Sequence, residues 1–242
     1  MSAESQGVWP DGRRAALSLS YDGTTINHLE TVLPLLFSLG IEATFYAYSP
    51  NLLDNSPLWR EAYRHGYEIG NGALLEAAHP DGSLLKWTSE MIASEIEMTD
   101  LLLDDLFVPI RERSFGYPWG LPRAAQGLDY REILEATGYV ARSGNAGMNS
   151  PFSCDLRHLN CCMADEMGSE AMIHESEIAV ESGSWLIFAF EGVGVGERGV
   201  DSSDHEALCR WISSNLDRFW TKSVIDVAHR VRTFKTTAAG LA

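Results

Sequence analysis

Apolar runs rich in β-forming residues alternate along the chain with stretches whose apolar residues recur at helical spacing. The run Ala15 to Ser20 is typical of a buried strand, and Ile26 to Leu39 carries apolar residues along one helix face. Gly40 follows directly, as expected where a helix ends in a left-handed residue. The same alternation predicts further strands at Ala43 to Tyr48, Tyr67 to Gly70, Ser114 to Tyr117, Tyr139 to Ser143, Trp185 to Phe190 and Phe219 to Ser223, and helices from Ser56, at Ser89 to Leu106, Tyr130 to Thr137 and Ser169 to Glu181, from Ser203, and at Val224 to Phe234.

This βα alternation over 242 residues, without an internal repeat, predicts a single barrel-like or doubly wound α/β domain. In such folds ligands bind at the carboxyl ends of the parallel strands. The residues that directly follow the predicted strands are therefore the candidate site. They are Asp22, the loop 71–85, Trp119 and Glu191.

The charge balance narrows the range of partners. Eighteen Lys and Arg against 34 Asp and Glu leave a net charge of −16, which would repel nucleic acid and anionic lipid, so we expect neither nucleic acid nor membrane as a partner. Residues 1–14 lack the basic and apolar regions of a secretory signal, and the cysteines lack paired zinc-site spacing, which predicts a cytoplasmic protein with free thiols. The sequence does not decide whether the protein forms a homo-oligomer.

Four predicted strand ends carry motifs in a fixed order. They are residues 16–23 (ALSLSYDG), which are followed by 40–46 (GIEATFY), then 66–71 (GYEIGN), 115–120 (FGYPWG), and the last strand with its loop, 185–194, together with Phe219 and Trp220. Together they resemble the polysaccharide deacetylases, the chitin, peptidoglycan and xylan deacetylase family also called carbohydrate esterase family four. The resemblance spans nearly the whole chain. It implies a distorted (β/α) barrel, with residues 1–242 as a single deacetylase-like domain and residues 1–13 as an N-terminal extension.

The resemblance also implies a divalent metal ion, zinc or a similar one, held by one aspartate and two histidines. The metal would polarise the acyl carbonyl and activate water, while a second aspartate acts as base and a histidine as acid. Asp22 matches the metal-binding aspartate. The second metal histidine corresponds to Glu76 without a gap, or to His79 if three residues are inserted. Asp22, His79 and Glu76 are therefore the predicted ligands if a metal is retained, and the alternative is that no metal binds.

Five positions depart from the family pattern, the second metal histidine among them. Tyr21 replaces the base, although a tyrosine with a pKa of about 10 is a poor base at neutral pH. Gly72 replaces the first metal histidine, Gly116 replaces the arginine that orients the base, and Glu191 replaces the acid. The family mechanism cannot run unchanged, and the predicted catalytic residues are Asp22, Glu191 and Tyr21.

Each candidate also has a plainer interpretation. Asp22 could cap a helix, His79 could be an exposed turn residue, and Glu76 could be a solvated surface residue. Glu191 ends a nearly continuous apolar strand, where an unpaired charge is costly, and this favours a role in a site.

Three further residues are predicted to bind substrate. Trp119 would stand at the mouth of the cleft, where an aromatic face can stack on a sugar, and Tyr117 lies beside it. His28 lies one turn into the helix that follows Asp22 and could reach the same cleft. Plain packing for Trp119 and a surface position for His28 are the alternatives.

The sequence leaves three functions open. The first is a divergent metal-dependent hydrolase of C–N or ester bonds in a small acylated or amino-sugar carbohydrate. The second is a metal-free enzyme, a hydrolase, lyase or isomerase, in which Asp22 and Glu191 act as an acid and base pair. The third is a binding protein that has lost catalysis. We favour the first two, because two carboxylates at strand ends are costly to keep without a use.

Overall fold

The computed structural model describes residues 7–79, 86–124, 127–196 and 198–240, and it confirms the predicted α/β barrel. The strands pair in parallel in chain order from β1 to β7, and β7 returns to β1, so that seven strands close the barrel. The eighth strand pairs with the beginning of β1. The strands are β1 (Ala15–Asp22), β2 (Ala43–Ala47), β3 (Glu68–Asn71), β4 (Phe115–Gly116), β5 (Ala141–Ala146), β6 (Leu159–Met163), β7 (Trp185–Phe190) and β8 (Phe219–Thr221).

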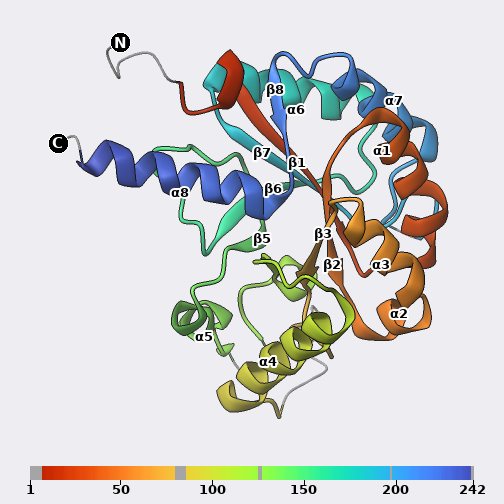
Figure 1. Ribbon diagram of the computed structural model, residues 1–242, viewed down its shortest axis with the longest axis vertical. Coiled ribbons are helices and arrows are strands. Elements are labelled where there is room, and N and C mark those ends of the chain that lie inside the picture. Colours follow the sequence, from red (N-terminus) through yellow and green to blue (C-terminus); the bar gives the residue numbers. More distant parts are fainter. Residues whose placement is uncertain (1–6, 80–85, 125–126, 197, 241–242) are drawn as a thin grey trace.

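Helices surround this barrel (Figure 1). In that view α1, α2 and α3 lie on one side, α8 on the opposite side, α6 and α7 above, and α4 and α5 below. None of the helices in the described ranges has both the length and the apolar content that a membrane-crossing segment needs. The helices are η2 (Pro10–Gly12), η3 (His28–Val32), α1 (Leu33–Leu39), α2 (Ser49–Asp54), α3 (Ser56–Arg64), α4 (Ser89–Leu106), η4 (Pro118–Gly120), α5 (Tyr130–Thr137), α6 (Ser169–Ser182), α7 (Ser202–Ser213) and α8 (Val224–Gly240).

Most predicted elements are present, with local differences. The strand predicted at Trp185 to Phe190 is β7 with the same bounds. The helix predicted from Ile26 begins there, passes through the π-helical turn η3 and continues as α1, which ends at the left-handed Gly40. The sequence did not predict α2 or β6. The β6 sequence, Leu-Asn-Cys-Cys-Met, lacks the β-branched and aromatic residues that mark a strand.

Two predicted segments extend beyond the described residues. Residues 1–6 of the expected N-terminal extension and residues 80–85 of the candidate loop lie outside them. Within the remainder of the extension, Trp9 is buried against the domain, and its indole nitrogen donates a hydrogen bond to the Gly183 carbonyl at 3.0 Å.

Strand β1 shows how the barrel is packed on both faces. Its odd-numbered side chains, Leu17, Leu19 and Tyr21, belong to the main apolar core, together with Val32 of η3 and Phe45 of β2. The even-numbered side chains point to the opposite face because side chains alternate along a strand. Both faces of a parallel barrel are covered, so nearly all of β1 is buried. The alternation places the neighbours Tyr21 and Asp22 on opposite faces.

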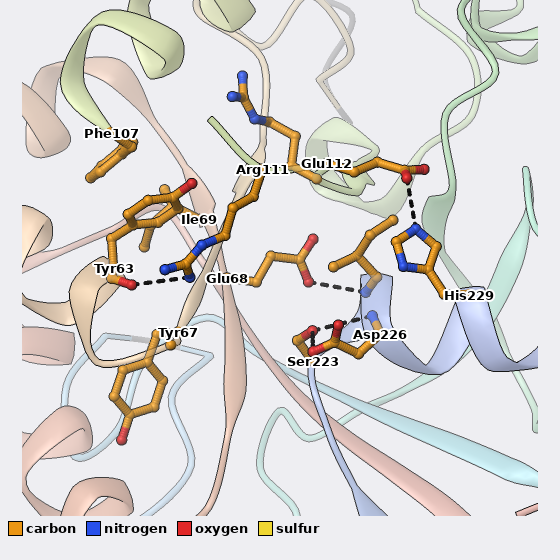
Figure 2. A pocket seen from close by; sticks show the side chains of 13 residues that line it. Tyr63, Tyr67, Glu68, Ile69, Phe107, Arg111, Glu112, Ser223, Asp226 and His229 are labelled. Carbon is orange, nitrogen blue, oxygen red and sulfur yellow. Dashed lines mark hydrogen bonds and ion pairs between the residues drawn. The ribbon is translucent and has the colours of Figure 1, made fainter. Parts of the chain in front are cut away.

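The amino end of the barrel is closed around a buried carboxylate, Glu68 (Figure 2). Glu68 accepts hydrogen bonds from the Thr44 hydroxyl, from the Ser114 amide and hydroxyl, and from the Ile225 amide at the start of α8. Burial raises the pKa of Glu68, and these hydrogen bonds oppose that shift. A small cavity of about 180 Å³ lies beside it. The acidic residue of the 66–71 motif therefore joins β2, β3, β4 and α8 at this end.

Candidate functional site

A cavity of about 550 Å³ lies at the carboxyl end of the strands. It brings together five of the predicted site residues, from the end of β1 and from the segments that follow β3, β4 and β7: Asp22, Glu76, Tyr117, Trp119 and Glu191. Other parts of its wall are aromatic or apolar. These are Ile26, Tyr46, Tyr48, Pro118, Met163 and Val195.

Asp22, the last residue of β1, forms an ion pair with Arg142 of β5. The Arg142 Nη2 atom donates to both carboxylate oxygens, at 2.6 and 2.8 Å. The Arg142 side chain is 1% exposed, whereas that of Asp22 is 32% exposed. Burial alone would lower the pKa of Arg142, but Asp22, Cys161 and Tyr46 together outweigh burial and raise it. Asp22 thus bonds a guanidinium rather than capping a helix, and Arg142 carries a permanent buried charge.

Arg142 lies beside the position where the family pattern expects an arginine that this chain lacks. Gly116 of β4 stands where the resemblance expects an arginine, and Arg142 is its register partner on the next strand. A Cβ atom on Gly116 would lie 2.7 Å from the ring of Tyr46, so that the tyrosine fills this space. The guanidinium carbon of Arg142 lies 5.0 Å from the centre of the same ring. The cation at this level of the barrel comes from β5 instead of β4.

Glu76 lies in the loop after β3 and is half-buried at the cavity wall. Its backbone is in the left-handed region, with φ 51°. Burial raises the pKa of the Glu76 carboxyl, and the charges of Asp22 and Glu95 add to the shift, while His79 and a hydrogen bond from the Trp119 side chain oppose it. Glu76 is therefore part of the site and not a solvated surface residue.

Glu191 follows β7 and is more open to solvent, with 47% of its side chain exposed. Its Oε2 atom lies 3.5 Å from Nε of Arg198, and Arg198 also donates to Asp165 at 2.9 Å. Partial burial raises the pKa of Glu191, Arg198 lowers it, and the charges of Asp165 and Asp22 raise it further. The charge of Asp22 thus contributes to the electrostatic environment of Glu191 at one cavity.

The catalytic role predicted for Tyr21 is contradicted by its position. Its side chain lies on the outer face of β1, fully buried, with its ring stacked at 5.0 Å on Phe45 and on Phe190. Its hydroxyl is hydrogen-bonded to Nε2 of His205 at 2.8 Å. Burial raises the pKa of Tyr21 well above its ordinary value. Tyr21 packs the core between the barrel and α7 and is not among the residues that line the cavity.

His28 is likewise not at the cavity, contrary to the prediction that it binds substrate. It is fully buried, with its ring edge against Tyr21 at 5.6 Å, and its Nδ1 atom accepts a hydrogen bond from the Thr25 amide. Burial lowers the pKa of His28 to about 4, so the ring is neutral at physiological pH. The residues just before it, Thr25, Ile26 and Asn27, line the cavity instead.

The two aromatic residues of the 115–120 motif both line the cavity. Trp119 is 39% exposed, has φ 55°, and meets His79 edge to face at 4.7 Å. Tyr117 is buried, and its hydroxyl donates to the Arg157 carbonyl at 2.8 Å, so that hydroxyl is already engaged. Trp119 therefore offers the more accessible aromatic surface.

The comparisons with known proteins give this site a family context. The family model for polysaccharide deacetylase matches residues 10–141. The chain belongs to the polysaccharide deacetylase family. No curated protein matches the chain.

Solved structures of polysaccharide deacetylases and related carbohydrate esterases share the fold. A putative polysaccharide deacetylase from Mycobacterium smegmatis is 13% identical, with a TM-score of 0.65 over 94% of this chain and 93% of that one. The carbohydrate esterase domain of a multidomain xylanase from the hindgut metagenome of Trinervitermes trinervoides is 14% identical, with a TM-score of 0.59 over 89% and 90%. A carbohydrate esterase family four pseudoenzyme from Bacillus anthracis is 10% identical, with a TM-score of 0.59 over 89% and 66%.

The metal ion of polysaccharide deacetylases does not fit the residues present here. Both oxygens of Asp22 accept hydrogen bonds from Arg142. A Cβ atom on Gly72 would lie 2.6 Å from the Ala47 carbonyl oxygen, so this position has no room for a side chain. Across the described ranges, no group of three or more His, Cys, Asp or Glu is arranged to hold a metal ion. The predicted ligands Asp22, His79 and Glu76 are therefore not assembled into a metal site.

Sequence reasoning missed Arg142 and Arg198, the two cations of the cavity region. A signal was present for Arg142, because it is a charged residue within the predicted strand Tyr139 to Ser143, where a charge needs a partner. The identity of that partner, 120 residues away, was not visible. Arg198 lies in a glycine-rich loop with no periodic pattern, and nothing in the sequence singled it out.

Proposed function

We propose that this polysaccharide deacetylase family member binds a small saccharide in the cavity without a metal ion and without deacetylation. The observation that carries the proposal is the Asp22–Arg142 pair, in which the aspartate that would bind the metal holds a buried guanidinium. The loss of the base supports it, because Tyr21 faces the core. A structure with the same fold is described as a carbohydrate esterase family four pseudoenzyme, which supports the proposal.

The charge of Arg142 acts against any divalent ion beside Asp22. An arginine side chain stays protonated in proteins. At an effective dielectric constant of about 20, a divalent ion roughly 4 Å from a guanidinium is repelled by about 8 kcal/mol. The two negative charges of Glu76 and Glu191 would offset part of this repulsion, but neither is grouped with Asp22 as a ligand set within the described residues.

The remaining wall suits a sugar. Trp119 presents an aromatic face on which a pyranose ring can pack. Asp22, Glu76 and Glu191 are acceptors for hydroxyl or amino hydrogens, and Arg198 adds donors. Among the described residues, three carboxylates line the cavity, against Arg198 in its wall and Arg142 paired with Asp22, and this balance favours a neutral sugar or one that carries a free amine.

A second candidate function is metal-free acid and base catalysis on the same saccharide. The observation that favours it is the raised pKa of both Glu76 and Glu191 at one cavity. An acid and a base need pKa values that are pushed apart, whereas these two move in the same direction. Binding without conversion is therefore the better supported function.

Calorimetric titration in the presence of a chelator tests the proposal. The ligands are trimers of N-acetylglucosamine, glucosamine, xylose and glucose. We expect at least one to bind with unchanged affinity when chelator is replaced by zinc, and to release no acetate. Trp119→Ala should weaken binding about tenfold through loss of the stacking surface. Phe152→Ala is the matched control, because Phe152 is 69% exposed and is not a cavity residue.

Binding that requires added zinc, zinc-dependent release of acetate, or absence of binding to every trimer would each contradict the proposal. Conversion of a bound trimer, followed by nuclear magnetic resonance and abolished by Glu76→Gln or Glu191→Gln, would establish the second candidate instead.

A further inference from the structure

Three large apolar side chains at the cavity are exposed to solvent. Ile26 is 46% exposed, Val195 is 50% exposed, and Trp119 is 39% exposed, and all three line the cavity. They come from the loops after β1, β7 and β4. Exposed apolar side chains that gather at one cavity mark a surface made for an apolar ligand group, whereas isolated ones need no explanation.

The loops that carry Ile26 and Val195 are fastened to each other. The Asn27 Nδ2 atom donates to the Val193 carbonyl at 2.9 Å, and the Val193 amide donates to Asn27 Oδ1 at 3.1 Å. These reciprocal bonds extend the pairing of β1 with β7 beyond the ends of both strands. Ile26 and Val195 each lie within two residues of this link, so they are held at the same rim.

The Val195 loop is itself closely folded. The Val200 amide donates to the Gly192 carbonyl at 3.0 Å, and the Gly194 amide donates to the Val200 carbonyl at 2.7 Å. A Cβ atom on Gly199 would lie 2.1 Å from the Val195 carbonyl oxygen, so the loop closes only with glycine at this position. The described part of the loop thus has a defined shape that presents Val195 outward.

Trp119 is held outward in η4, directly after β4, and β4 is not a neighbour of β1 or β7 in the barrel. Its left-handed backbone is uncommon for a bulky residue and is kept by hydrogen bonds from the Gly120 amide to Tyr117 and from the Leu121 amide to Pro118. The backbone of Gly120 also packs directly on Gly144. The cavity therefore has apolar side chains on two sides of its rim and carboxylates further along its wall.

We infer that the saccharide carries a linear hydrocarbon chain, and that this chain lies against Ile26 and Val195 while the sugar packs on Trp119. The inference rests on the proposed function. A hydroxyl-rich sugar alone would leave Ile26 and Val195 facing water, whereas an attached chain of several carbons removes both from water and gains the corresponding free energy. Two points of attachment are compatible with this placement: the amine, which would carry an acyl group, and the anomeric oxygen, which would carry an alkyl group.

Two ligand series test the inference and separate the points of attachment. One series consists of N-acylglucosamines and the other of 1-O-alkyl glucosides, each with chains of about one to eight carbons, titrated in chelator. We expect affinity to rise about two- to fourfold for each added methylene in one series, up to a limit set by the rim. The series with this gradient identifies the attachment.

Ile26→Ser and Val195→Ser should each reduce the gradient, so that the loss of affinity grows with chain length. Leu101→Ser is the matched control, because Leu101 is 63% exposed on α4 and is not a cavity residue, and it should leave the gradient unchanged. Because the substituted side chains are exposed, thermal unfolding should confirm that all three variants fold.

The outcomes of this test are distinct from those of the saccharide proposal. Affinity that is independent of chain length in both series, with the shortest members still bound, would overturn the inference and leave saccharide binding intact. A gradient that persists in the Ile26 and Val195 variants would also overturn it. Failure of every member to bind while a trimer still binds would overturn the inference alone, and failure of every member and of every trimer would overturn both.

Discussion

The two ends of the barrel use carboxylates in opposite ways. At the amino end, Glu68 accepts four hydrogen bonds from β2, the start of β4 and α8, and is 7% exposed. At the carboxyl end, Glu76 and Glu191 face a cavity, and Asp22 is partly exposed beside Arg142. A carboxylate whose acceptors are filled by the protein stabilises the fold, whereas one with acceptors turned to a cavity is available to a ligand.

The largest expected effect is at the amino end. Glu68→Ala should lower the free energy of unfolding by about 4 kcal/mol, because the buried Ser114 and Ile225 amides lose their acceptor. Denaturant unfolding measures this loss. Glu68→Gln, which keeps the shape and one acceptor, should fall between the parent and the alanine variant. A loss below about 1 kcal/mol for Glu68→Ala would show that this end is not held by its carboxylate.

At the carboxyl end, Arg142→Met should lower the free energy of unfolding by about 3 kcal/mol, because it leaves Asp22 without its partner at a largely buried position. Adding Asp22→Asn should recover part of that loss, since the amide carries no charge to desolvate. The measurement is a double-mutant cycle from denaturant unfolding. Additive effects of the two substitutions would refute coupling between these residues.

Tyr21→Phe tests whether the core face of β1 affects stability without affecting the cavity face. Loss of the hydroxyl leaves Nε2 of buried His205 without that partner, which should cost about 1 kcal/mol of unfolding free energy. Saccharide affinity should not change, because Tyr21 is not a cavity residue. Parallel unfolding and calorimetric titrations check both statements. A change in saccharide affinity larger than about threefold would show that Tyr21 contributes to binding.

The smallest effect concerns Glu76 and depends on pH. Because its folded pKa is raised above 4.5, the associated stabilisation is present below that unfolded value and is lost as pH rises through the raised pKa. Glutamine does not titrate. Glu76→Gln should therefore gain stability relative to the parent, by less than about 1 kcal/mol, between about pH 4 and pH 7. Thermal unfolding across this range tests it, and a constant difference would contradict the pKa direction.

Part of the site could be predicted from the sequence because strand ends are easy to locate. Asp22, Trp119 and Glu191 follow predicted strands, and in the structure all three line one cavity. The direction of each side chain was harder to predict. Tyr21 precedes Asp22 by one residue, and since side chains alternate along a strand, that single step sends it into the core. The direction of the His28 side chain was also predicted wrongly. The π-helical turn that contains His28 places this residue inside the domain.

The sequence by itself determined an α/β domain of alternating strands and helices, because the pattern of apolar runs and helical stretches reports which residues each element must bury, and the family resemblance selected the barrel. It also determined which strand ends carry unusual residues. Only the tertiary structure decided that Asp22 holds Arg142, that Tyr46 fills the space beside Gly116, and that no room exists at Gly72. These are contacts between strands far apart in the chain, and their geometry depends on how the barrel closes. The local sequence pattern does not specify how the barrel closes.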